Sequence, residues 1–215
     1  MTIKPFSSDT ELLRFSRKFF DDRIGTFRKD FAICLTADKQ NHHAYFPALI
    51  TCIAFVDLVS GLYAGKLEHH GLADLKAYAY RFMNRSNYDS LRLEILYEMF
   101  RHKLAHLAYP YVVFDTATKP KRFIGQKPRR ITWTVYASKR QVPIELIESK
   151  TPQYLIKSVR PWAVSYNSRV LISLRKLQQD IINSIRGRGG YLRALEKDAK
   201  LQEKFAACMR TYFPP

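Results

Sequence analysis

Hydrophobic residues recur at helical spacing through the first half of the chain. They lie three and four positions apart, as one buried face of a helix requires. We expect helices over about residues 9–28, 46–64, 72–83 and 87–107. Ser8 or Asp9 suits the N-cap of the first helix, and Gly65 follows the second. Pro110 prevents the fourth helix from extending much further.

The pattern changes in the middle of the chain, where β-branched and aromatic residues alternate with polar ones. This alternation predicts strands over about residues 111–115, 123–124, 131–137 and 144–147, with a turn at 126–128. Helical spacing returns over about 166–185 and 191–209. The predicted fold class is therefore mainly α: a helical bundle with a small β-rich basic insertion (108–150) after the fourth helix. No linker divides the chain, so we expect one domain over residues 1–215.

Composition narrows the class of protein. The chain has 215 residues, of which 47% are hydrophobic, and this content excludes disorder as the main state. The three cysteines, Cys34, Cys52 and Cys208, form no CxxC pair, so neither a disulfide framework nor a cysteine-rich zinc site is expected. We expect a cytoplasmic protein, because the N-terminal residues lack the pattern of a secretory signal.

The longest apolar stretch runs over residues 46–64 and approaches the length of a membrane span. Asp57 lies inside it. A carboxylate at the centre of a bilayer costs about 2.5–3.5 kcal/mol. We therefore interpret the stretch as a core or interface helix and expect no membrane association.

Positive charge is concentrated in the second half of the chain. The formal net charge is +17, and residues 116–215 account for +15 of it. Such asymmetry indicates a polyanionic partner, most simply RNA. The most densely basic stretch is 116–140, which has eight Lys or Arg, no Asp or Glu, and aromatic residues between the basic ones. Cations neutralise phosphates and aromatics stack on bases; alternatively, the stretch is a hairpin with inward aromatics and solvated charges. The candidate RNA-binding residues are Lys121, Arg122, Lys127, Arg129, Arg130 and Trp133.

Candidate catalytic residues cluster at the end of the fourth predicted helix, where Arg101, His102 and His106 stand close in sequence. Histidine is suited to proton transfer near neutral pH. The planar guanidinium of arginine matches a phosphate. In an α-helix, Arg101 and His106 point about 140° apart, so their tips meet only near a helix end or across a cleft. RNA transesterification needs both of these groups and no metal or other cofactor.

This spacing resembles the HEPN superfamily (higher eukaryotes and prokaryotes nucleotide-binding). Its pattern is Arg, a polar residue, a spacer and His, with four to six residues between Arg and His; here there are four. The context is also similar: a hydrophobic helix ending in 61–65, a short helix, and the phrase LAHLAYP over 104–110. The resemblance covers about residues 8–110 and the predicted helix from Tyr166.

The resemblance implies a metal-independent endoribonuclease, often a toxin or phage-defence effector, that dimerises so that two motifs line one cleft. By position, His106 would be the acid and base, Arg101 would bind the scissile phosphate, and His102 would orient them. The products would be a 2′,3′-cyclic phosphate and a 5′-hydroxyl. An antitoxin or other regulatory protein is a further expected partner. Other members of the superfamily have lost activity and only bind nucleotides or partners.

Two carboxylates are candidates for a supporting role. Asp57 is costly within an apolar helix unless it is paired. It would either orient Arg101 or His106 or form a structural salt bridge. Glu98 belongs to a stripe at i,i+4 spacing with Glu94, His102 and His106. That stripe fits a metal site or, alternatively, plain Glu-to-His pairing on an exposed face.

A third interpretation of the function depends on the distribution of charge alone. A helical module that binds nucleic acid or a nucleotide without turnover would show the same basic half. No Gly-rich phosphate loop of the P-loop or dinucleotide type occurs in the sequence, so nucleotide hydrolysis and cofactor-dependent redox chemistry are not expected. The sequence therefore predicts a homodimeric ribonuclease, with a non-catalytic binding module as the alternative.

Overall fold

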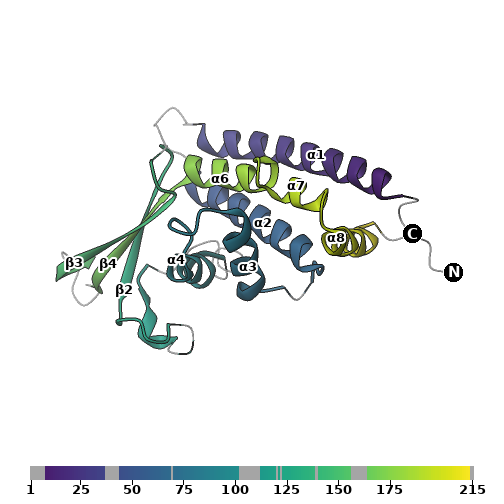
Figure 1. The fold of residues 1–215 in the computed structure, drawn as a ribbon. Helices are drawn as coiled ribbons and strands as arrows, with labels where there is room; N and C mark the ends of the chain where they lie inside the picture. Colours follow the sequence, from purple (N-terminus) through teal and green to yellow (C-terminus); the bar gives the residue numbers. More distant parts are fainter. Residues whose placement is uncertain are drawn as a thin grey trace.

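A computed structural model describes residues 8–36, 44–68, 70–101, 112–119, 121, 123–138, 140–155 and 164–213. A layer of helices carries a four-stranded sheet at one end (Figure 1). The helices are α1 (Asp9–Leu35), α2 (Tyr45–Ala64), α3 (Leu72–Phe82), α4 (Ser90–Ile95), α6 (Leu174–Arg186), α7 (Tyr191–Leu195) and α8 (Ala199–Tyr212). A π-helix, η1 (Leu96–Arg101), continues α4, and η2 (Thr116–Thr118) is a short 3₁₀ turn. The strands are β1 (Phe114–Asp115), β2 (Arg130–Tyr136), β3 (Ile144–Leu155) and β4 (Val164–Ser173).

The first three predicted helices are confirmed, with shifted ends. The fourth, predicted over 87–107, is α-helical only over Ser90–Ile95 and continues as a π-helix to Arg101, and residues 102–107 lie outside the described residues. Ser8 caps α1 through a 3.2 Å hydrogen bond from the Glu11 NH, and this helix extends seven residues beyond the predicted end. Gly65 ends α2 with a φ of 83°, a left-handed conformation that glycine adopts without strain. Asp89 caps α4 by accepting a 2.8 Å hydrogen bond from the Arg92 NH, and α4 begins at Ser90.

Helix α2 is the centre of the helical layer. It contacts α1, α3, α6, α8 and η1. Phe55 of α2 stacks on Phe27 of α1 with ring centroids 4.5 Å apart. Among the described helices, α2 alone has the length and hydropathy that a membrane span requires. Half of its most apolar 18-residue segment is buried against other parts of the chain.

The predicted fold class is wrong, because the molecule combines helices with a mixed sheet whose strand order is β1-β2-β4-β3. The error lies mainly at 166–185, where the predicted helix is strand β4 up to Ser173 and helix α6 from Leu174. Val170, Leu171 and Ile172 are consecutive and buried, as in a central strand covered on both faces. Their spacing to later leucines also fits a helix, and periodicity alone does not separate the two. The sheet therefore extends past the predicted insertion and joins the helical layer through α6.

The predicted pairing within the sheet also differs. Strand β2 pairs in parallel with β4 and antiparallel with the short β1. It does not pair with residues 123–124, which belong to no strand. Phe123 is instead buried against Phe114, with ring centroids 5.8 Å apart. A turn with Gly125 at a φ of 70° follows it. Strand β3 is longer than predicted and is interrupted by a bulge between Glu148 and Gln153.

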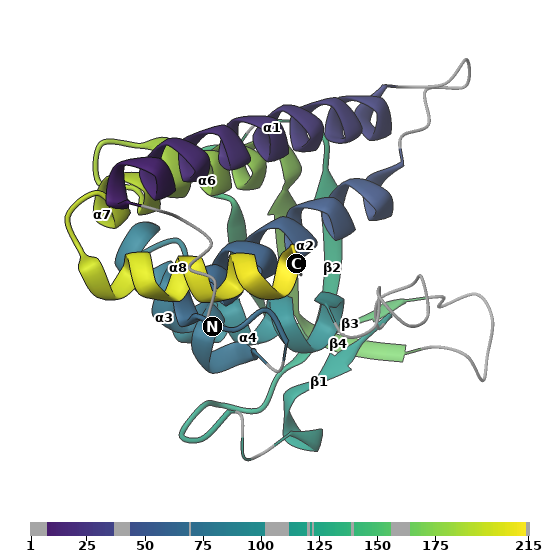
Figure 2. The same ribbon diagram turned by 90° about the vertical axis from the view of Figure 1, so that its right-hand side faces the viewer.

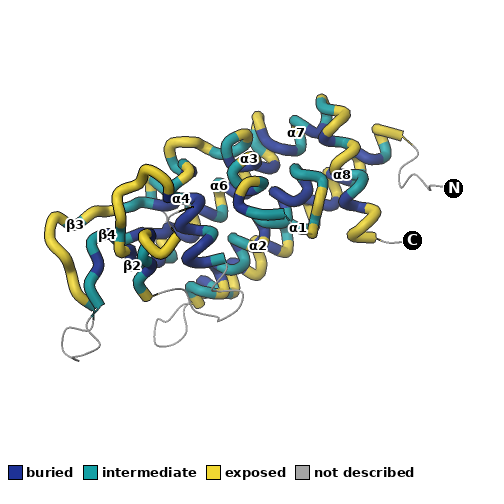
Figure 3. Tube along the Cα trace, turned by 90° about the horizontal axis from the view of Figure 1, so that it is seen from below, coloured by how far each residue is buried: buried dark blue, intermediate teal, exposed yellow. Residues whose placement is uncertain are grey.

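Trp133 of β2 joins the sheet to the helices. Its ring meets Phe46 of α2 at 5.2 Å and Phe100 of η1 at 6.4 Å, both nearly edge-on. Strand β2 thus runs beside the N-terminal half of α2 (Figure 2). Figure 3 shows buried residues along the helical layer, whereas much of β3 is exposed. Through these contacts Phe100, and with it the neighbouring Arg101, is fixed between sheet and helices.

Candidate functional site

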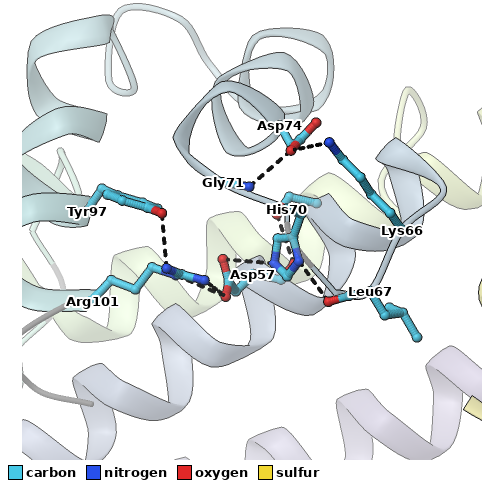
Figure 4. Close-up of polar contacts among 9 residues, drawn as sticks. Asp57, Lys66, Leu67, His70, Gly71, Asp74, Tyr97 and Arg101 are labelled. Atoms are coloured by element: carbon cyan, nitrogen blue, oxygen red, sulfur yellow. Dashed lines mark hydrogen bonds and ion pairs between the residues drawn. The ribbon is translucent and has the colours of Figure 1, made fainter. Parts of the chain in front are cut away.

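Arg101 and Asp57 form an ion pair between η1 and α2. The Nε and Nη2 atoms of Arg101 both donate to Asp57 Oδ2, at 3.0 and 2.7 Å (Figure 4). The charge of Asp57 therefore has a partner within an otherwise apolar helix. The contact fits both alternatives for Asp57, an orienting role toward Arg101 and a structural salt bridge.

Tyr97 holds the other side of the guanidinium. Arg101 Nη1 donates to the Tyr97 hydroxyl at 3.1 Å, and the guanidinium carbon lies 4.8 Å from the centre of the Tyr97 ring. Both residues belong to the π-helix η1. A π-helix closes i→i+5 hydrogen bonds and is wider than an α-helix. The angles expected for α-helical geometry, including the Glu-His stripe, therefore do not apply over Leu96–Arg101.

His70 approaches Asp57 from the opposite side. Its Nε2 lies 3.2 Å from Asp57 Oδ1, without the alignment of a hydrogen bond, and its Nδ1 lies 2.9 Å from the Leu67 carbonyl oxygen. A carbonyl oxygen only accepts, so Nδ1 carries a hydrogen. Gly61 makes room for this ring, because a Cβ there would lie 3.4 Å from His70 Nδ1 and 2.9 Å from the Lys66 carbonyl oxygen. We call Asp57, His70, Tyr97 and Arg101 the Asp57 cluster.

The Asp57 cluster is largely shielded from water. The side chains of Asp57, Arg101 and His70 are 19%, 27% and 11% exposed. Burial lowers the pKa of Arg101, but its hydrogen bond and charge interaction with Asp57 and its interaction with Tyr97 outweigh this, so the net pKa is raised. Arg101 thus stays a cation. A cavity of about 30 Å³ borders Asp57, Tyr97 and Arg101, which is room for about one water molecule.

Arg101 retains hydrogen-bonding capacity. A guanidinium has five N–H donors. Asp57 takes two and the Tyr97 hydroxyl takes one. Within the described residues, the remaining two, one on each terminal nitrogen, are not used. They fit the oxygens of a phosphate group.

The other two motif residues, His102 and His106, lie outside the described residues, and so does Arg122. Of the proposed metal stripe, the two carboxylates are described. Glu94 accepts hydrogen bonds from Lys76 and Ser90, and Glu98 lies 3.5 Å from Lys119 Nζ. Both carboxylates thus face a lysine, which competes with a metal ion. No group of three metal-ligating side chains occurs within the described ranges.

The predicted RNA-binding residues fall into two groups. Lys121, Lys127 and Arg130 are exposed. Arg129 instead bonds Glu148 Oε1 through Nε and Nη2, both at 2.8 Å, and donates from Nη1 to the Lys127 carbonyl oxygen at 3.1 Å. Trp133 is partly buried in the packing between sheet and helices. Exposed cations are thus present near 121–130, but Arg129 and Trp133 also support the fold.

Comparisons of this chain with protein-family models, with curated proteins and with solved structures find no match. The functional assignment therefore depends on the residues themselves.

Sequence reasoning did not predict two members of the Asp57 cluster. Tyr97 stands four residues before Arg101, a spacing that places side chains side by side on a helix, so it could have been found. His70 follows a loop after α2, and its position depends on how residues 65–71 turn back toward Asp57. No spacing in the sequence indicates that turn.

Proposed function

We propose that this protein is a metal-independent endoribonuclease whose reaction resembles that of the HEPN superfamily. The anchoring of Arg101 by Asp57 and Tyr97 is the observation that supports the proposal most directly. It fixes a permanent cation, with two N–H donors that no described residue uses, five residues before His106. A phosphate-binding arginine must keep its charge and its orientation, and both conditions hold here.

The proposed reaction needs one base, one acid and one cation. His106 accepts the proton of a ribose 2′-hydroxyl, whose oxygen then attacks the adjacent phosphorus. The bond from phosphorus to the 5′-oxygen breaks, and that oxygen takes a proton from an imidazolium. Arg101 stabilises the negative charge that grows on the phosphate oxygens. The products are a 2′,3′-cyclic phosphate and a 5′-hydroxyl, with no net change in protons.

RNA binding is proposed to involve the exposed cations near the sheet. Lys121, Lys127 and Arg130 are exposed and lie in the segment with the densest positive charge. Contacts with phosphates give affinity that falls as salt rises. We also propose a homodimer, because the motif to which this one is similar acts in pairs across a shared cleft.

The proposal is tested by incubating purified protein with RNA in EDTA. The wild type should cleave, whereas His106→Ala should not. His42→Ala replaces a histidine outside the motif and should cleave like the wild type. If His106→Ala loses cleavage activity but binds RNA as tightly as the wild type, His106 acts in the catalytic step and not in RNA binding.

The alternative is a nucleic-acid-binding module without catalysis. The pairing of Arg101 with Asp57 is the observation that favours it, because the carboxylate neutralises part of the charge offered to a phosphate. Salt-sensitive RNA binding by a wild type that does not cleave would select this alternative. Cleavage that appears only with a divalent metal would contradict the metal-independent mechanism.

A further inference from the structure

We propose that His70 is a positioning residue, which fixes the orientation of Arg101 by occupying the second oxygen of Asp57. The expected effect on RNA cleavage rests on the proposed function. The effect on the orientation of Arg101 depends only on the contacts within the Asp57 cluster. Asp57 lies between Arg101 and His70 (Figure 4). His70 has no direct route to a substrate, since one ring nitrogen faces Asp57 and the other faces the Leu67 carbonyl.

The two oxygens of Asp57 have separate partners. Oδ2 accepts two N–H groups from Arg101, and Oδ1 faces His70 Nε2 at 3.2 Å. A carboxylate with a partner on one oxygen only can rotate and offer either oxygen to the guanidinium. A partner on each oxygen removes this freedom. The plane of Arg101, and hence the direction of its two spare donors, then follows from the position of His70.

The described residues 65–68 and 70–71 of the loop after α2 hold His70 in this place. Lys66 and the Gly71 NH lie 3.2 and 3.0 Å from Asp74 Oδ2 of α3. Burial raises the pKa of Asp74, but the Gly71 hydrogen bond, Lys66 and the nearby His70 outweigh it and lower the net pKa. The loop is thus tied to α3 on one side. On the other side it lies against α2, where Gly61 leaves the necessary space.

Two substitutions separate the two contacts of the ring. In His70→Gln, the side-chain amide reaches about as far as Nε2, so it retains a donor toward Asp57 and loses the bond to Leu67. In His70→Asn, the shorter amide takes the place of Nδ1, so it retains the bond to Leu67 and loses the contact with Asp57. The pair is therefore a matched test of which contact matters.

The first readout is the NMR signal of the Arg101 Nε–H, assigned by its absence in Arg101→Lys. We expect His70→Asn to increase the solvent exchange of this proton about tenfold, and His70→Gln to leave it close to the wild type. Equal exchange in all three proteins, or equal increases in both variants, would overturn the proposal.

The second readout is RNA cleavage. We expect kcat to fall about tenfold in His70→Asn, with KM little changed. His70→Gln should retain most of the wild-type kcat. A wild type that does not cleave RNA contradicts the proposed function, while the Arg101 signal still decides the role of His70. Normal cleavage by His70→Asn, together with an unchanged Arg101 signal, would show that His70 does not position Arg101.

Discussion

Arg101 and Arg129 use the same chemistry in different surroundings. Each places Nε and Nη2 against a single carboxylate oxygen: Arg101 donates from both to Asp57, and Arg129 donates from Nε to Glu148 and forms an ion pair with it through Nη2. The carboxylate of Asp57 is 19% exposed and also faces His70, whereas that of Glu148 is 50% exposed. Arg129 uses its remaining terminal nitrogen on the Lys127 backbone, and Arg101 uses its own on the Tyr97 hydroxyl. Within the described part of the chain, each guanidinium therefore keeps two N–H groups, but the side chain of Arg101 is 27% exposed and that of Arg129 only 15%.

The comparison shows that formal charge does not measure the charge available to a ligand. Arg129 stands in the most basic stretch of the sequence, yet its ion pair with Glu148 ties the residue before β2 to strand β3. Arg101 stands in the nearly neutral half, yet its side chain is more exposed than that of Arg129, and its carboxylate partner is held within the Asp57 cluster. Exposed ion pairs contribute little stability, whereas shielded ones fix orientation. We therefore propose a catalytic role for Arg101 and a structural role for Arg129.

The largest expected effect follows from removing Arg101. Arg101→Ala should reduce RNA cleavage by about 10²–10³-fold, the usual cost of losing one group that stabilises the transition state. Arg101→Lys keeps the charge without the planar fork and should also be strongly impaired. Rates with saturating RNA measure both. Arg129→Ala is the matched control and should retain the wild-type rate within about threefold; equal losses at the two positions would erase the distinction.

Stability should distinguish the two carboxylates. Asp57→Asn leaves Arg101 with a weaker partner in a shielded place and should lower the free energy of unfolding by about 1–2 kcal/mol. Glu148→Gln changes a half-exposed pair and should cost less than about 0.5 kcal/mol. Urea denaturation of both variants provides the comparison. A larger loss in Glu148→Gln would mean that the sheet, and not the Asp57 cluster, holds the more important ion pair.

RNA affinity should depend more on the exposed cations near the sheet than on Arg129. The double variant Lys127→Glu and Arg130→Glu should weaken binding and reduce the slope of log K against log salt by about one per lost phosphate contact. Arg129→Glu should have a smaller effect on that slope, because Arg129 already has a carboxylate partner. Binding titrations at several salt concentrations test this. Unchanged slopes in all variants would show that the exposed cations are only a solvated face.

The smallest effect concerns the loop that carries His70. The pKa of Asp74 is lowered in the folded state despite the opposing effect of burial, because of Gly71, Lys66 and His70. A lowered carboxyl pKa stabilises the fold above the ordinary range near 4 and loses this effect as pH falls through the folded value. Asp74→Asn should therefore cost about 1 kcal/mol at pH 7 and progressively less in acid. Urea curves at several pH values measure it, and a constant difference would contradict the charge-based account.

Several features were predictable because they depend on local chemistry. Ser8 caps a helix, Gly65 ends one, and Asp57 within an apolar helix indicated a paired charge. The run from Val170 to Ile172 was not, since buried strands and buried helices share the same residues and neighbouring strands decide between them. The widening of η1 and the place of His70 depend on packing between segments far apart in the sequence.

The most direct test of the proposed chemistry is the analysis of RNA ends after incubation with the wild-type protein in EDTA. The proposed reaction predicts fragments that end in a 2′,3′-cyclic phosphate and begin with a 5′-hydroxyl. Intact RNA, or fragments with a 3′-hydroxyl and a 5′-phosphate, would contradict transesterification by Arg101 and His106.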